Sequence, residues 1–248
     1  MIIYFSGTGN CLKIAKALGE HLKEDVVPLK EARNDASERL IFIFPTYCFE
    51  MPPNVKEVIK HFIMYKYQII MGISVSAGMN GNSEYTFNQL IEGKGLKVTA
   101  FVNVAMADNV MPILLGKESN YVEADMEQII EKLSEQNYRN EAKYKKIYRL
   151  GSRLMFGSGG KKFLKKKVKE EKCIGCGLCK SVCPNNNITV YQSKAHIHDR
   201  CVECFACMNW CPTQAIYIRK PIEAKMQYRN PDINPQELNQ SIKHLKES

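Results

Sequence analysis

The chain has 248 residues, of which 45% are hydrophobic and 25% charged, with a formal net charge of +9. This is the composition of a soluble globular protein with one large domain or two small ones. No apolar run approaches the roughly 20 residues that a membrane span needs, and the start, MIIYFSGTGN, has no basic leader region. We therefore expect a cytoplasmic protein. Its ten cysteines then indicate metal binding, because the cytosol keeps thiols reduced and disulfides are rare there.

The first 137 residues alternate short apolar runs with amphipathic stretches. Strands are predicted at 1–5, 25–29, 40–45, 68–76 and 97–104, and helices at 10–22, 53–65, 83–92 and 121–137. Two of the strands, IIYF and LIFIF, are apolar at nearly every position, as burial on both faces of a parallel sheet requires. This pattern predicts an α/β domain over 1–137, with a doubly wound, five-stranded parallel sheet.

The next segment, 138–171, is strongly basic. Residues 138–172 contain 13 Lys or Arg and three Glu, and GSGG interrupts them at 157–160. We interpret the segment as a basic helical linker, solvated on its surface. A docking surface for an acidic redox partner or for a membrane is the alternative, and no nucleic acid is expected.

Eight of the cysteines form a repeat of period 28, in which residues 173–188 align without a gap on residues 201–216. Both halves read C-x2-C-x2-C-x3-C-P. The predicted metal ligands are Cys173, Cys176, Cys179 and Cys183 in the first half, and Cys201, Cys204, Cys207 and Cys211 in the second.

This spacing is typical of two [4Fe–4S] clusters. In the bacterial arrangement the fourth cysteine of each motif binds the other cluster, so Cys211 completes the first site and Cys183 the second. Zinc is the alternative, although zinc sites usually pair two separated CxxC knuckles. Residues 172–220 resemble the dicluster bacterial ferredoxin family, which implies a small α+β domain there. The tail, 221–248, is predicted to contain a short helix capped at Asn234.

A second candidate site follows the first strand, where a loop rich in Gly and hydroxyl side chains leads into a helix. Backbone N–H groups, two hydroxyls and a helix N-terminus favour a phosphate. The loop lacks the Lys of a Walker A motif and the G-x-G-x-x-G spacing, so the phosphate of flavin mononucleotide (FMN) fits better than a nucleoside triphosphate or a dinucleotide. An ordinary glycine turn is the alternative. The loop residues are Ser6, Gly7, Thr8, Gly9, Asn10 and Cys11.

Residues 1–137 resemble the flavodoxin family, whose first loop has the form S/T-x-T-G-N-T. Here Cys11 replaces the last Thr, which removes one hydroxyl. The resemblance implies that FMN binds, with its ring at two further loops, 45–52 and 76–83, beyond the third and fourth strands. The ring-loop candidates are Thr46, Tyr47, Cys48, Phe49, Ser76, Ala77, Gly78, Asn80 and Gly81.

The whole chain resembles flavodoxin–ferredoxin fusions, small iron–sulfur flavoproteins found largely in anaerobes. That resemblance implies an electron carrier between two [4Fe–4S] clusters and FMN, with redox partners such as an acidic ferredoxin or flavodoxin. The alternatives are an FMN-dependent reductase of a small acceptor and an iron–sulfur module that no longer binds FMN. We assign no catalytic residue: Asp108 has no convergent His or Ser, and neither Cys11 nor Cys48 has a resolving cysteine in a CxxC motif.

Overall fold

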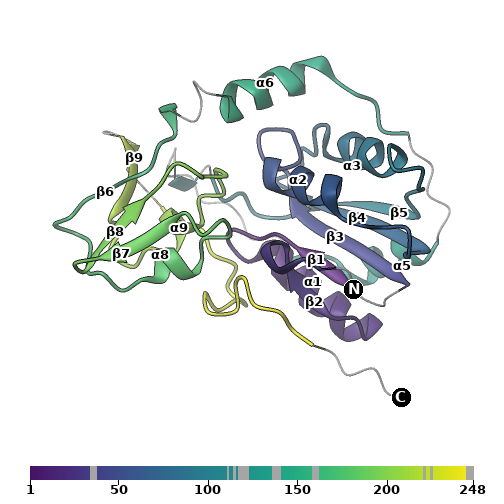
Figure 1. Cartoon of the computed structure of the whole chain (residues 1–248), viewed down its shortest axis with the longest axis horizontal. Coiled ribbons are helices and arrows are strands. Elements are labelled where there is room, and N and C mark those ends of the chain that lie inside the picture. Colours follow the sequence, from purple (N-terminus) through teal and green to yellow (C-terminus); the bar gives the residue numbers. More distant parts are fainter. Residues whose placement is uncertain are drawn as a thin grey trace.

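A computed structural model describes residues 1–33, 38–110, 112–113, 116, 123–135, 141–157, 162–219, 222–223 and 226–243. An α/β domain formed by the N-terminal segments lies beside a smaller cysteine-rich domain (Figure 1). None of the described helices has the length and apolar character that crossing a bilayer requires.

The sheet of the α/β domain is fully parallel, with strand order β2-β1-β3-β4-β5. This is the flavodoxin-like order of a doubly wound fold, and it confirms the predicted fold class. The strands are β1 (Ile2–Tyr4), β2 (Val26–Pro28), β3 (Arg39–Pro45), β4 (Ile69–Ser76) and β5 (Ala100–Ala105).

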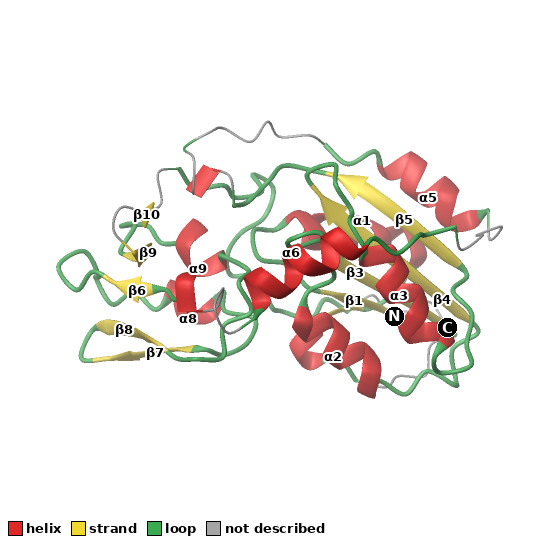
Figure 2. Cartoon of the chain, turned by 90° about the horizontal axis from the view of Figure 1, so that it is seen from above, coloured by secondary structure: helices red, strands yellow, loops and turns green. Residues whose placement is uncertain are grey.

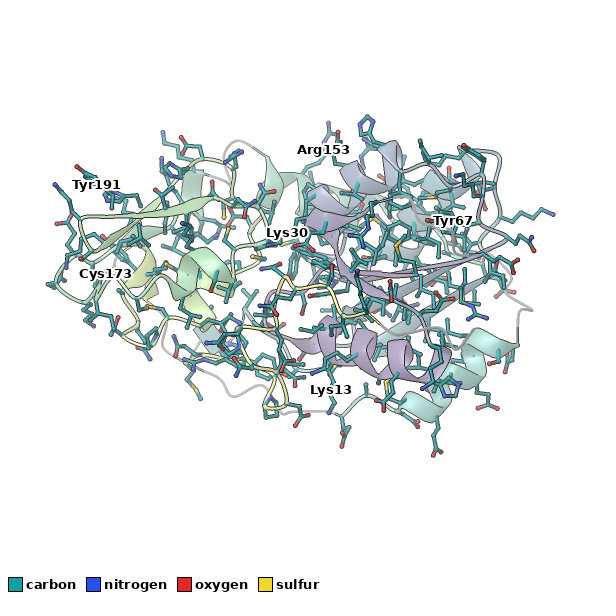
Figure 3. All side chains as sticks on the ribbon, turned by 60° about the horizontal axis from the view of Figure 1, so that its bottom comes forward. Lys13, Lys30, Tyr67, Arg153, Cys173 and Tyr191 are labelled. Carbon is teal, nitrogen blue, oxygen red and sulfur yellow. The ribbon has the colours of Figure 1, made fainter. Side chains whose placement is uncertain are left out.

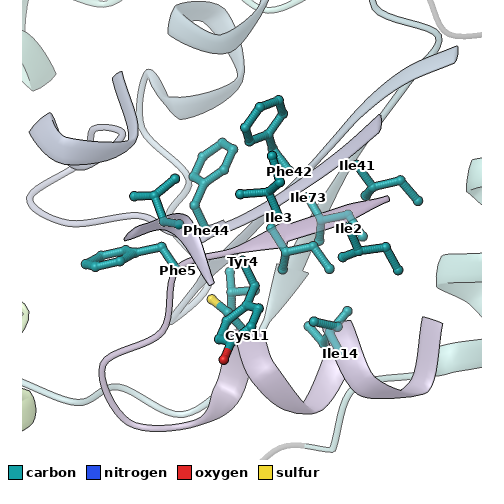
Figure 4. Close-up of a cluster of buried hydrophobic side chains, with 14 of the residues drawn as sticks. Ile2, Ile3, Tyr4, Phe5, Cys11, Ile14, Ile41, Phe42, Phe44 and Ile73 are labelled. Atoms are coloured by element: carbon teal, nitrogen blue, oxygen red, sulfur yellow. The ribbon is translucent and has the colours of Figure 1, made fainter. Parts of the chain in front are cut away.

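Helices cover both faces of this sheet. Helix α1 (Asn10–Leu22) contacts α5 (Met126–Ser134), and α2 (Pro53–His61) contacts α3 (Ser83–Glu92). A 3-10 turn, η1 (Leu29–Glu31), follows β2. Side chains such as Ile2, Ile3 and Phe42 are at most 1% exposed (Figure 4). Their continuous apolar runs thus fill the core on both sides of the sheet.

Two predicted helix boundaries were wrong. Helix α2 ends at His61 rather than at residue 65, because Phe62 takes up an extended backbone and its ring packs edge-on against Phe42, with centroids 6.0 Å apart. Helix α5 begins at Met126, because the Asp125 side chain caps it by accepting a 2.9 Å hydrogen bond from the backbone N–H of Gln128. Residues 121, 122, 136 and 137 lie outside the described part of the chain.

The basic segment contains a helix, α6 (Lys146–Phe156), that lies against the α/β domain (Figure 2). The Tyr148 ring stacks on Phe49 with centroids 5.1 Å apart. The Asn82 side chain also exchanges two hydrogen bonds, of 3.0 and 2.9 Å, with the backbone of Lys145. These contacts attach α6 to the loops that follow β3 and β4.

The cysteine-rich domain is built from short elements. Strand β9 (Ile216–Arg219) pairs antiparallel with β6 (Lys167–Val168) and β10 (Ile222–Glu223), and β7 (Ile188–Tyr191) forms a hairpin with β8 (Lys194–Ile197). The helices α8 (Leu178–Ser181) and α9 (Ala206–Asn209) complete it. Since β6 belongs to this sheet, the domain starts inside the segment that the sequence assigned to the linker.

The C-terminal segment, 226–243, forms turns rather than the predicted helix at Asn234. Its backbone groups form hydrogen bonds with the α/β domain instead. Ile242 pairs with Val26 of β2, and the Tyr4 hydroxyl donates to the carbonyl of Gln240 at 2.9 Å. Lys16 and Glu237 also form an ion pair at 2.6 Å. The tail therefore packs along α1 and β2 on the α/β domain.

Candidate cofactor sites

The eight cysteines of the repeat line two cavities, each built from both halves. We call them the distal site and the proximal site. The distal site is lined by Cys173, Cys176, Cys179 and Cys211, and the proximal site by Cys183, Cys201, Cys204 and Cys207. These are the two crossed sets that the spacing predicts.

The chain wraps each cavity through left-handed backbone conformations. In the first half these fall on Gly175 and Gly177, with φ of 70° and 76°. In the second half the equivalent positions are Glu203 and Phe205, with φ of 56° and 57°. Each half then carries its third cysteine on a single helical turn, α8 or α9. The two halves thus share one backbone form although the second lacks the glycines.

Backbone amides also donate to the fourth cysteine of each half in equivalent ways. The N–H of Asn187 donates to Cys183 Sγ at 3.3 Å, and that of Ala215 to Cys211 Sγ at 3.2 Å. The Asn187 side chain differs from Ala215 because it bonds the backbone of His198 and Arg200 at 3.0 and 2.7 Å. It thereby fixes the link between the two halves.

The donor sets fit a cluster better than a single ion. Among the described residues, no three Cys, His, Asp or Glu side chains form a group that could hold one metal ion. Zinc draws its four thiolates around one centre, with Zn–S bonds of about 2.3 Å, whereas a four-iron cluster binds each thiolate through a different iron atom. The spacing, in which a third cysteine follows at the same interval and Cys-Pro ends each motif, favours the cluster.

Burial explains why the most enclosed of these thiols need a metal to ionise. Burial, with a smaller contribution from the nearby Cys211 and Cys173, raises the pKa of Cys179 to about 11. Burial likewise raises the pKa of Cys204 to about 12. A bound metal displaces such protons because it stabilises the thiolate directly. Cys179 and Cys204 are therefore suited to metal binding and poorly suited to nucleophilic chemistry.

Two adjoining cavities lie at the carboxyl ends of β1, β3 and β4. The phosphate-loop cavity is lined by Ser6, Gly7, Thr8, Asn10, Cys11, Pro45, Thr46, Tyr47, Val75, Ser76, Ala77, Ala107, Asp108 and Asn109. The ring cavity, of about 270 Å³, is lined by Thr46, Tyr47, Cys48, Phe49, Ser76, Ala77, Met79, Asp108, Asn109, Val110, Leu164, Glu203 and Phe205. The shared residues make the two cavities one continuous site.

Four predicted loop residues do not line either cavity. Gly9 caps α1 with φ of 106° and packs against the tail, while Gly81 packs on the Phe49 backbone. Asn80 accepts a 2.6 Å hydrogen bond from the Ser76 hydroxyl, and Gly78 has open space around it. These four residues set the conformation of the loops, and neighbouring loop residues line the two cavities.

The two cysteines outside the repeat are not activated as nucleophiles. Cys11 lies in the core beside Tyr4 (Figure 4), and burial raises its thiol pKa strongly. Burial also raises the pKa of Cys48 to about 11. At neutral pH both therefore remain thiols, in agreement with a packing role.

Tyr47 supplies a polar group for a ligand. Its ring is buried at the junction of the two cavities, and in the described part of the chain its hydroxyl has no hydrogen-bond partner of good geometry. Burial raises the pKa of this hydroxyl well above its usual value, so it stays protonated. The first turn of α1 adds backbone N–H groups that lack intrahelical acceptors. A phosphorylated, ring-containing ligand would satisfy these donors.

The proximal site touches the phosphate loop directly. Trp210 Nε1 donates to the carbonyl of Gly7 at 3.0 Å, and Asn109 Nδ2 to the carbonyl of Cys204 at 3.4 Å. A Cβ atom at Gly7 would lie only 2.7 Å from the Cys204 carbonyl oxygen. The proximal site thus lies against the α/β domain. Cys173 of the distal site and Tyr67 of the α/β domain lie at opposite ends of the molecule (Figure 3).

Sequence reasoning missed several residues of this junction. The tail residues Tyr228 and Asn230 donate to Asn10 Oδ1 at 2.8 and 3.0 Å, and the Asn230 N–H donates to the Thr8 carbonyl at 2.8 Å. Leu164, Glu203 and Phe205 form the cysteine-domain wall of the ring cavity. For two of these residues the sequence offered a signal: Glu203 and Phe205 stand where the first half of the repeat has Gly175 and Gly177.

Comparisons with known proteins agree with the cysteine sites. Two sequence families, each described as a 4Fe-4S binding domain, match residues 166–189 and 201–215. No curated protein matches the chain. Among solved structures, rubredoxin oxygen:oxidoreductase from the anaerobe Desulfovibrio gigas is similar to 62% of the chain, at 15% identity and a TM-score of 0.41. The chain spans 36% of that protein, and a TM-score of this size does not establish a shared fold.

The matched families and the cysteine cavities define an iron–sulfur protein with two 4Fe–4S binding motifs. The strand order of the N-terminal sheet, β2-β1-β3-β4-β5, is flavodoxin-like. The chain thus combines a flavodoxin-like parallel sheet with two 4Fe–4S binding motifs.

Proposed function

We propose that this protein transfers electrons between two [4Fe–4S] clusters and FMN. The observation that carries the proposal is the shared wall between the proximal site and the ring cavity. Phe205 lines both cavities. The Cys204 carbonyl and the hydroxyl of Tyr47, a ring-cavity residue, also both lie against Gly7. Iron–sulfur clusters carry single electrons, whereas a flavin accepts one or two, so the pairing converts between the two modes.

In this proposal the cysteine sets keep their crossed ligation, one cluster in the distal site and one in the proximal site. The loop from Ser6 to Cys11 holds the FMN phosphate through backbone N–H groups and hydroxyls. The ring cavity holds the isoalloxazine, with the Tyr47 hydroxyl as a donor. The order of the three sites is then distal, proximal and flavin.

A carrier of this kind needs a protein partner rather than a catalytic residue. We propose an acidic ferredoxin or flavodoxin that docks in the cytoplasm on the Lys-rich segment leading into β6, which includes Lys162 and Lys165. Charge complementarity of this kind raises association rates. Electron-transfer rates with such a partner should fall steeply as salt rises, and rates independent of salt would exclude this docking site.

Cofactor analysis after anaerobic purification tests the proposal. We expect about eight iron and eight sulfide per chain, together with one FMN. FMN should also slow maleimide labelling of Cys48, which lines the ring cavity. Chains with clusters but no affinity for FMN would support the iron–sulfur module alternative, and turnover with quinones or nitro compounds would support the reductase.

A further inference from the structure

The distal and proximal sites have the same cysteines but different electrostatic surroundings. Among the described residues that line the distal site none is charged. Lys166 and Arg200 both line the proximal site. The proximal site therefore has charged side chains in its wall that the distal site lacks.

Lys166 is the buried member of the two cations. Its side chain is 1% exposed and forms an ion pair with Glu203, whose side chain is 4% exposed. The Lys166 ammonium also lies 4.4 Å from the centroid of the Phe205 ring. In this protected position its charge is screened much less than that of a surface lysine.

The ion pair has a defined direction. Lys166 lines the proximal site, whereas Glu203 does not line it and instead lines the ring cavity. Lys166 therefore belongs to the wall of the proximal site, and Glu203 belongs to the wall of the ring cavity.

This arrangement is costly for the fold. A buried ion pair loses hydration that its mutual attraction only partly returns. Glu203 and Phe205 also occupy left-handed backbone positions where the first half has Gly175 and Gly177. Side chains kept at strained positions are a mark of function, and here both contribute to the wall between the two cofactor sites.

We infer that Lys166 raises the reduction potential of the proximal cluster above that of the distal cluster. Reduction adds a negative charge to the cluster, and a buried cation at its edge stabilises that charge. An electron entering the pair of clusters then resides mainly on the cluster beside the ring cavity. The inference rests on the proposed cluster sites, and it does not require FMN to be bound.

Lys194 provides the matched control on the distal side. Its ammonium donates to the carbonyl of Cys173 at 2.8 Å, but the side chain is half-buried and does not line the distal site. Water and salt therefore screen it more effectively than Lys166. Lys194→Met should have the smaller effect on a cluster potential.

The test is a potentiometric titration of the cluster-loaded full chain, followed by electron paramagnetic resonance. The wild type should show two potentials. Lys166→Met should lower the higher one by at least a tenfold change in the reduced-to-oxidised ratio, which is 59 mV for one electron. Glu203→Gln should raise the same potential, and Lys194→Met should shift only the other, by less.

Iron analysis of each variant separates loss of a cluster from a change of potential. If Lys166→Met loses iron, the neutral double variant Lys166→Met/Glu203→Gln, which leaves no buried charge unpaired, should still lower the higher potential. Two equal wild-type potentials would overturn the inference, as would variants that leave both potentials unchanged or shift both alike. A wild-type chain without about eight iron would instead refute the cluster assignment of the proposed function.

Discussion

The two domains differ in what stabilises their folded structures. The α/β domain has a continuous apolar core, in which the Phe87 ring packs against Phe42 and Phe44 with centroids 6.1 and 6.0 Å apart. The cysteine-rich domain has described strands of only two to four residues and two helical turns. Such a small domain generally needs metal ligation to be stable. From this comparison we expect the sheet to keep its fold when metal is removed, and the cysteine-rich domain to lose its fold.

Removal of iron should produce the largest difference in stability between the two domains. After chelation under reducing conditions, we expect hydrogen exchange at residues 162–219 to approach that of an unfolded chain, because the cluster ligation that orders them is lost. Strands β1 and β3 should keep their protection. Equal loss of protection in both domains would show that they fold as one unit.

Loss of a single ligand should distinguish the two sites. Cys204→Ser should reduce the iron content from about eight to about four per chain, and so should Cys176→Ser. Only Cys204→Ser removes the cluster beside the phosphate loop, so that variant should lose reduction of bound FMN by the remaining cluster. Cys176→Ser should keep FMN reduction, because its remaining cluster is the proximal one. Equal FMN reduction in both variants would contradict the assigned order.

The sequence predicted the elements that depend on local patterns. The bounds of α1 and α3 match their predictions, because each is an amphipathic run that begins directly after Gly9 or Asn82. The cysteine spacing predicted both cysteine-lined cavities. The junction between the domains was not predictable. The Tyr228 hydroxyl, for example, bonds Asn10, 218 residues away in sequence, and contacts of that range leave no periodic pattern.

A change at the domain junction should have an intermediate effect. Gly7→Ala places a methyl group 2.7 Å from the Cys204 carbonyl oxygen and 3.1 Å from the Tyr47 hydroxyl. We expect a loss of about 1–3 kcal/mol in unfolding free energy, together with weaker FMN binding. Urea titration and FMN titration measure the two effects.

Gly151→Ala is the matched control for this substitution. Among the described residues its added Cβ would meet the Phe49 ring alone, at 3.7 Å, and the substitution replaces a glycine within α6. That change should stabilise the protein by up to about 1 kcal/mol. A Gly7→Ala protein as stable as Gly151→Ala would show that the domains are not closely packed at the phosphate loop.

Trp210→Phe should have the smallest effect. It removes the 3.0 Å hydrogen bond from Trp210 Nε1 to the Gly7 carbonyl and keeps most of the apolar contact. We expect a loss of about 1 kcal/mol and unchanged iron content. Thermal unfolding followed by flavin fluorescence would measure it, and a loss of clusters would show that Trp210 supports the proximal site itself.

The most direct test of the central claim is the rate of electron transfer from clusters to FMN within one chain. Rapid one-electron photoreduction of the clusters, followed by flavin absorbance, should show first-order flavin reduction whose rate does not change with protein concentration. The same step should disappear in Cys204→Ser. A rate that rises with protein concentration, or one that is equal in Cys204→Ser, would contradict transfer through the proximal site.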